Sequence, residues 1–193
     1  MATFWTDANI NNPKRNFRFK VQISAGAFET DATDLSTTDF YWAKTAEKPS
    51  FTINAAEHNY LNHTFKFPGR ISWNDISITM VDPGEERGVA YALAKMLADS
   101  GYNVPSTTSD LSTISKSKAV GEATKSGASV RVVQLDDDGD EIEAWVLKNA
   151  FITDAKFGTL DYGSDDLTEY SITFKYDWAV LDNSGGQVTY QTS

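Results

Sequence analysis

Side chains that could perform catalysis are few, and each candidate pattern lacks a part that its chemistry needs. Ser115-Lys116-Ser117-Lys118 matches the serine–lysine pattern of penicillin-binding enzymes, but the partner motifs of those enzymes are missing. Asp165 and Asp166 could serve acid–base catalysis, yet adjacent acids in a turn before a strand are usually solvated. The chain also lacks phosphate-binding glycine loops and zinc-protease motifs. The sequence therefore predicts that the protein is not an enzyme.

Metal-binding patterns are equally incomplete. His58 and His63 are the two histidines, and a spacing of five places them on opposite faces of a strand, where zinc needs a turn and a third ligand. The acidic run 136–143 resembles a calcium loop only faintly, because its glycine is misplaced and the final bidentate acid is missing. Cysteine is absent, which excludes disulfides, thiolate catalysis and iron–sulfur clusters. We expect no cofactor and no metal.

Composition describes a folded, acidic protein. The chain has 193 residues, 40% of them hydrophobic and 12% aromatic, which suits one domain spanning 1–193. Its formal net charge of −10 argues against a surface that binds nucleic acid through phosphates. No apolar run approaches the roughly 18 residues of a membrane helix, and the N-terminus lacks a signal-peptide pattern. We expect synthesis in the cytoplasm without membrane insertion.

Alternating apolar residues predict many strands. A period of two runs through residues 17–23, 76–80 and 170–178, and the last segment is the longest. Further strands are predicted at 40–46, 50–54, 60–67, 130–135, 142–148 and 151–157, with a break at Pro68-Gly69 and an Asp-Gly turn at 138–139. The inventory indicates a mainly β protein, an antiparallel β-sandwich or barrel with one packed α-helix.

The helix is predicted at 83–99. Asp82 suits the N-cap, Pro83 the first helical position and Gly101 the stop, while an apolar stripe recurs at helical spacing. Residues 103–129 are rich in Ser, Thr, Lys and Gly without an apolar period. We interpret them as a polar surface insertion.

The order of these segments resembles a known family. The segments are FRFKVQI after Asn12-Pro13, KTAEKPSF, the return YLNHTFKFPG, SWNDISITMVDPGEE leading into the helix, and LTEYSITFKYDWAVL. This order is similar to the tail tube protein of contractile-tailed (myovirus-type) bacteriophages, whose fold is shared with type VI secretion tubes and other contractile injection systems. The resemblance covers the chain except for about 103–129.

The resemblance implies a structural function. Members close six copies into a ring and stack the rings as the inner tube of the tail, the conduit for genome delivery. It implies partners in the tail sheath, baseplate and tail terminator proteins, transient passage of double-stranded DNA, and a location in the virion tail after synthesis in the host bacterium. A ring of six would carry about −60, six times the formal charge of −10, and a negative lumen would repel phosphates.

Three sets of residues are candidates for assembly. The family's excursion between two mid-chain strands contacts the next ring and maps here to 45–62. The ring-stacking candidates within and beside it are Glu47, Lys48, Phe51, Glu57, His58, Asn59 and Tyr60. Segregated charges suggest head-to-tail docking through Lys14, Arg15, Arg18, Lys20, Asp136, Asp138 and Asp140. The polar side of the C-terminal strand offers lumen candidates, namely Ser171, Thr173, Lys175 and Asp177.

Two alternatives stay open. The chain could be the inner tube protein of a secretion or extracellular contractile injection system, carrying protein effectors instead of a genome. From a different class, it could be a carbohydrate-binding β-sandwich module with Trp5, Trp42 or Trp73 as the stacking platform. Such a module would stay monomeric and bind glycans saturably, whereas a tube protein would assemble.

Overall fold

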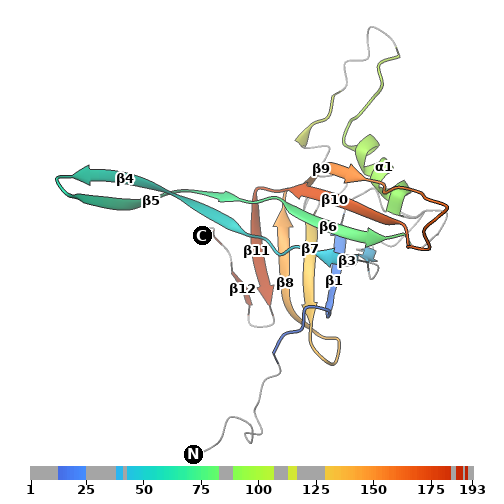
Figure 1. The fold of residues 1–193 in the computed structure, drawn as a ribbon, viewed down its shortest axis with the longest axis horizontal. Helices are drawn as coiled ribbons and strands as arrows, with labels where there is room; N and C mark the ends of the chain where they lie inside the picture. The colour runs from blue at the N-terminus through green and yellow to red at the C-terminus, as the bar shows by residue number, and fades with distance from the viewer. Residues whose placement is uncertain are drawn as a thin grey trace, which may run out of the picture.

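Two antiparallel β-sheets form the body of the protein, and a long two-stranded hairpin projects from it (Figure 1). The computed structural model describes residues 13–24, 38–40, 43–82, 89–106, 113–116, 129–183, 186–188 and 190. The antiparallel sheets and the packed helix confirm the predicted fold class.

The six-stranded sheet has the order β12-β11-β8-β7-β1-β2. Its strands are β1 (Phe19–Ser24), β2 (Thr38–Phe40), β7 (Ser129–Leu135), β8 (Glu141–Lys148), β11 (Trp178–Asn183) and β12 (Gly186–Val188). The strands predicted at 17–23, 130–135 and 142–148 are confirmed as β1, β7 and β8. Between β7 and β8, Gly139 has a φ of 90°, which the predicted Asp-Gly turn requires.

The four-stranded sheet has the order β3-β6-β10-β9. Its strands are β3 (Ala43–Ala46), β6 (Ile76–Val81), β9 (Phe151–Lys156) and β10 (Glu169–Lys175). β3 and β9 are its edge strands and have no further hydrogen-bonded neighbour among the described residues. The strands predicted at 76–80 and 151–157 are confirmed as β6 and β9, whereas the single strand predicted at 40–46 is two, β2 and β3, in different sheets.

The core lies between the two sheets because each presents its apolar positions to the other. Ile76, Ile78 and Met80 alternate along β6 with half-exposed residues, and all three are at most 1% exposed. The other buried members of this cluster are Val21, Ile23, Val89, Leu93, Val130, Val132, Leu147, Ala150, Tyr170, Ile172, Phe174, Tyr176 and Ala179.

Helix α1 (Val89–Asp99) places Val89 and Leu93 of the predicted apolar stripe in the core and packs Met96 against it, whereas Leu97 at the end of the stripe is 48% exposed. Gly101 follows it with a φ of 96°, the left-handed conformation of a helix stop. The first turns predicted at 83–88 lie outside the described residues. The Asp82 carboxylate, predicted as the cap, accepts a 2.7 Å hydrogen bond from the Tyr170 hydroxyl.

The prediction of one long strand at 170–178 is wrong. β10 ends at Lys175, the chain bends at Tyr176 and Asp177, and β11 begins at Trp178 in the other sheet. The amide of Asp177 donates to the carbonyl of Lys148, which holds the corner. Alternation continues through the bend because Tyr176 stays in the core, so periodicity could not reveal the change of sheet.

The predicted break at Pro68-Gly69 is also wrong. β4 (Phe51–Tyr60) and β5 (His63–Trp73) pair along their whole length as the projecting hairpin, which we call the arm (Figure 1). The ladder shifts register where Ile53 pairs with Ile71 and Ala55 with Pro68, so that Asn54 faces two residues of β5. A bulge of this kind accommodates a proline that cannot donate to a regular ladder.

We predict that Gly69→Ala loosens the arm at this bulge. A methyl group there would lie 2.7 Å from the backbone oxygen of Asn54, so the backbone must move, at a cost of about 1–3 kcal/mol. Amide hydrogen exchange should become faster in β4 and β5. Gly163→Ala is the control, because its methyl group would approach only the Asp161 side chain, at 3.4 Å. Unchanged exchange in the arm would contradict the close approach.

Candidate assembly surfaces

The arm carries apolar side chains that the described chain leaves exposed. Near the body, Phe51 pairs with Trp73 and Ile53 with Ile71, and these four side chains form the root patch on one face. Beyond the bulge, His58 pairs with Phe65, Tyr60 with His63 and Ala56 with Phe67, on the opposite face of the ladder. Tyr60, Phe65 and Phe67 are 63%, 45% and 54% exposed. We call Tyr60, Phe65 and Phe67, with His58 and His63, the tip patch.

Both histidines therefore lie on the same face, which corrects the opposite-face prediction. The chain reverses at Leu61 and Asn62 between them, and His63 packs edge-on against Phe65 with ring centroids 4.7 Å apart. Within the described residues, no three His, Asp or Glu side chains lie close enough to hold a metal ion.

The other face of the outer arm is polar. Glu57 and Lys66 sit opposite each other with 3.5 Å between their charged atoms, and the Thr64 hydroxyl donates to Asn59 Oδ1 at 2.8 Å. Such cross-strand pairs hold the register of the two strands. The tip of the arm thus has one apolar and one polar face, a pattern typical of an element whose apolar face is covered by a partner.

The root of the arm is fixed to the body. The Asn74 amide donates to the Ser50 carbonyl at 2.9 Å, which closes the base of the hairpin. Trp73 contacts the rings of Phe51, Tyr176 and Tyr190 at centroid distances of 5.4, 5.9 and 6.3 Å. Tyr176 belongs to the core, so these rings connect the arm to the packed body. Trp73 is the only one of the three tryptophans of the carbohydrate hypothesis among the described residues, and it is committed to this contact.

Two of the predicted stacking residues hold the root instead of projecting with the arm. The Glu47 carboxylate accepts a 2.9 Å bond from the Ser77 amide. Lys48 Nζ donates to Gln134 Oε1 at 2.6 Å and to Glu143 Oε1 at 2.8 Å. The other five predicted residues, Phe51, Glu57, His58, Asn59 and Tyr60, all belong to β4. Their contact with a neighbouring ring stays a prediction.

The structure brings basic and acidic segments together within one chain. Lys14 pairs with Glu143, Lys20 with Glu141 at 2.9 Å, and Arg18 approaches Asp137 at 3.9 Å. The carbonyl of Arg15 accepts from Gln134 Nε2, and Asp136 accepts from the Asp138 and Asp140 amides. At these contacts, the basic segment near the N-terminus and the acidic segment of β7–β8 therefore pair with each other within one subunit. Docking between subunits through the same residues stays a prediction.

Glu143 is the centre of this network. Its side chain is only 14% exposed, and it accepts bonds from Lys14, from Lys48 and from Trp145 Nε1 at 2.7 Å. Burial alone raises the pKa of this carboxyl, but the bonds from Lys14, Lys48 and Trp145 outweigh it and hold the pKa at about 2. Glu143 thus joins the N-terminal segment, the root of the arm and the six-stranded sheet.

The predicted lumen residues divide into two groups. Ser171 and Thr173 lie opposite Thr79 and Ser77 on the outer, polar face of the four-stranded sheet, because Ile172 and Phe174 point into the core. The charges here are paired, Lys175 with Asp75 and Lys156 with Asp154, both at 3.6 Å. Hydroxyl groups and balanced ion pairs thus line this face.

Asp177 lies apart from that face, in the bend between β10 and β11. It accepts bonds from Lys116 at 2.6 Å and from Asn149 Nδ2 at 2.7 Å, and both bonds lower its pKa. Lys116 belongs to the predicted surface insertion and to the serine–lysine pattern, so its ammonium group serves as an anchor here. Ser117 and Lys118 lie outside the described residues.

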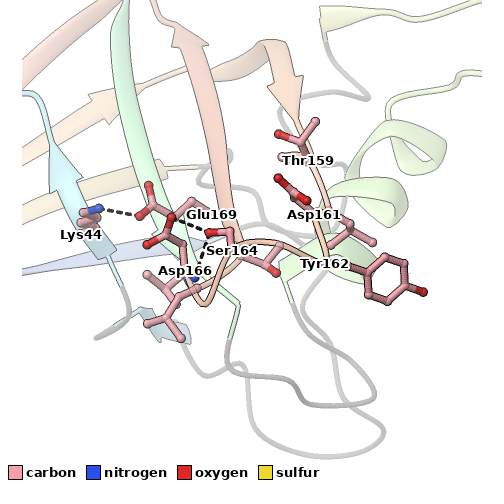
Figure 2. Close-up of a pocket in the computed structure, with 12 residues that line it drawn as sticks. Lys44, Thr159, Asp161, Tyr162, Ser164, Asp166 and Glu169 are labelled. Carbon is pink, nitrogen blue, oxygen red and sulfur yellow. Dashed lines mark hydrogen bonds and ion pairs between the residues drawn. The ribbon is translucent and has the colours of Figure 1, made fainter.

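Sequence reasoning missed a pocket at the far end of the four-stranded sheet (Figure 2). A depression of about 1220 Å³ lies between β3, β6 and the loop 157–168 that joins β9 to β10. Asp161, Asp166 and Glu169 line it, Lys44 pairs with Glu169, and Tyr162 points outward (Figure 2). Leu160, Tyr162 and Leu167 are more than 70% exposed. Large apolar residues within an acidic loop were the signal available in the sequence.

No helix among the described residues is long and apolar enough to cross a membrane. No protein-family model matches the sequence, and no curated protein sequence matches it. Solved structures do share the fold.

The matching chains belong to contractile machines. One from the tube-terminating cap of the anti-feeding prophage has a TM-score of 0.62 and 16% identity, over 95% of this chain and 100% of that chain. One from the baseplate of the same particle has a TM-score of 0.62 and 12% identity, over 89% and 97%. One from the sheath–tube complex of the extracellular contractile injection system PVC has a TM-score of 0.59 and 16% identity, over 90% and 94%. The predicted resemblance to contractile-tail tube proteins is confirmed for the fold.

We predict that Glu143→Gln destabilises the subunit. The carboxylate contributes up to about 3 kcal/mol at neutral pH, because folding lowers its pKa from 4.5 to about 2. That contribution is complete above pH 4.5 and is lost as the pH falls toward 2. Chemical denaturation measures the free energy of unfolding at pH 7 and at pH 3. The difference between these two values should be smaller for the variant than for the natural chain. Asp138→Asn, at an exposed turn, is the control. An equal pH dependence of both chains would contradict the assignment.

Proposed function

We propose that this protein is the inner-tube subunit of a contractile, phage-tail-like machine, and that six copies form a ring and rings stack into a hollow tube. The arm is the observation that carries this proposal. A two-stranded hairpin has little stability alone in water, and this one has strands of ten and eleven residues, about 34 Å long, with its apolar patches exposed. A second subunit that covers those patches accounts for both features.

The edges of the four-stranded sheet support ring closure. Within the described part of the chain, the outer edges of β3 and β9 have no strand neighbour, and joining β3 of one copy to β9 of the next continues the sheet around a ring. The continuous sheet closes into a barrel, which removes both edges. Its polar face, with Ser77, Thr79, Ser171 and Thr173, then forms the lumen wall.

The proposed partners follow from assembly. The outer surface meets a sheath protein, and the two ends of the tube meet baseplate and tail terminator proteins. The structural likeness to a chain from a sheath–tube complex and to one from a tube-terminating cap supports this part of the proposal. The protein is made in the host bacterial cytoplasm and becomes part of the virion tail or of the injection particle.

We propose double-stranded DNA as the cargo, in passage without retention. A hydroxyl-lined wall with paired charges offers few cations for phosphates, so a duplex can slide without binding. Passage of protein effectors is the second candidate, and the likeness to extracellular injection systems favours it. Analysis of purified particles for DNA and for protein inside the tube distinguishes the two candidates.

Substitution of the tip patch should prevent tube growth. Phe65→Ser with Phe67→Ser removes apolar surface that stacking buries, and we expect the critical concentration for tubes to rise more than about tenfold. Negative-stain microscopy and sedimentation measure the change. Tyr102→Ser with Val104→Ser removes comparable exposed apolar surface away from the arm and is the control. Tubes of normal length from the tip variant, or a natural protein that stays monomeric at every concentration, would refute the proposal.

A cation introduced on the polar face should trap DNA. Thr173→Lys adds about six charges to each ring of six, and bound phosphates then release counterions, so retention should fall steeply with salt. Assembled tubes are incubated with short duplex DNA and treated with nuclease, and the protected DNA is measured. Thr113→Lys, exposed in the insertion, is the control and should protect none. Intact Thr173→Lys tubes without protected DNA would remove this face from the lumen.

A further inference from the structure

The arm and the β9–β10 pocket lie at opposite ends of one sheet. The arm enters β6 through Trp73 and Asn74 at its Ile76 end, and Val81 at its other end pairs with Glu169 beside the pocket. Figure 1 shows the same relation, with β4 and β5 extending away from the body on one side and the β9–β10 connection on the other. No arm can reach the pocket of its own subunit, so a contact between them must join two copies.

The two surfaces have matching apolar character. The tip patch presents Tyr60, Phe65 and Phe67, and Leu61 at the turn is 87% exposed. The pocket presents Leu160 at 88%, Leu167 at 71% and a fully exposed Tyr162. Exposed side chains of this size on a loop are costly unless another surface covers them. The aromatic residues of the tip, together with Tyr162 in the loop, are of the type that is enriched at interface centres.

The two surfaces also have opposite charge. The loop carries Asp161, Asp165 and Asp166, and Glu169 at the start of β10 pairs with Lys44. The arm carries Lys66 and Arg70 against a single acid, Glu57, which pairs with Lys66 at 3.5 Å, so its net charge is +1. Opposite potentials steer association and set its register, while two like surfaces would repel.

We propose that the tip of the arm of one copy docks in the β9–β10 pocket of the next copy. Tip-patch side chains contact Leu160, Tyr162 and Leu167, and the net positive charge of the arm attracts the acidic loop. This inference rests on the proposed tube, and it identifies the receptor of the arm. The contact is head-to-tail, so each copy uses both surfaces and the chain of contacts continues through the assembly.

Paired cysteines test the contact, because the natural chain has none. Leu61→Cys with Leu160→Cys, assembled and then joined by oxidation or a short bis-maleimide, should give a ladder of covalent multimers on denaturing gels. Leu61→Cys with Asp138→Cys, at the β7–β8 turn, is the control pair and should give only monomers. The single variants are further controls. Leu61→Cys alone would be joined only through tip-to-tip contacts, and Leu160→Cys alone only through loop-to-loop contacts.

Charge exchange gives a second measurement. Asp161→Lys with Asp165→Lys should raise the critical concentration for tubes more than about tenfold, and adding Lys66→Glu with Arg70→Glu should restore it. Normal tubes that give no ladder with the first cysteine pair would overturn the docking inference and leave the proposed function intact. A ladder from the control pair would place the receptor elsewhere. Absence of tubes from the natural chain would overturn the proposed function itself.

Discussion

The arm exposes apolar surface that its own chain does not cover, and this constraint explains how the rest of the structure is arranged. A hairpin of two strands has no interior, so every apolar side chain that it carries faces water on one side or the other. Tyr60, Phe65 and Phe67 would be unfavourable on a hairpin that functions alone, yet the structure holds it rigidly at its base. A fixed, amphipathic projection is useful when a second molecule completes it. The body of the protein then fixes the position and the orientation of the arm.

Two local clusters hold the arm in place. Trp73 packs at a tilt against Tyr176 in the core, and Lys48 connects the start of the arm to Glu143 on the six-stranded sheet. One cluster is aromatic and the other ionic, and they lie on the two strands of the hairpin root. Tilting the arm therefore disturbs either the packing or the ion network. Since the Glu143 carboxylate has a pKa of about 2, the ionic link persists through the physiological pH range.

Sequence periodicity predicted the amphipathic strands well and failed where tertiary structure overrode local pattern. Alternation located β1 and β6, and the Asp-Gly turn between two apolar segments located β7 and β8. The β10–β11 corner keeps its alternation through a change of sheet, and the Pro68-Gly69 bulge looks like a strand end when neighbours are unknown. Charge patterns had the same weakness. Lys14 and Glu143 are 129 positions apart, and only the fold shows that they are partners. The candidate site shared this limit, because only residues 50–54 of β4 were predicted as strand and the pocket beside the loop 157–168 was not predicted at all.

The charge distribution also changes how the acidity of the chain should be interpreted. Most of the basic segment near the N-terminus is paired with the β7–β8 acids, and the polar face of the four-stranded sheet balances its own lysines. In contrast, the loop 157–168 carries three acids, Asp161, Asp165 and Asp166, and no basic residue. Acidic side chains cluster at one end of the sheet, and the arm at the other end is more basic. The two ends of the subunit therefore differ in charge. Copies that meet end to end attract, and copies that meet with like ends repel. In the proposed tube, polarity of this kind would favour growth with a single orientation of subunits, so that the two ends of the tube differ.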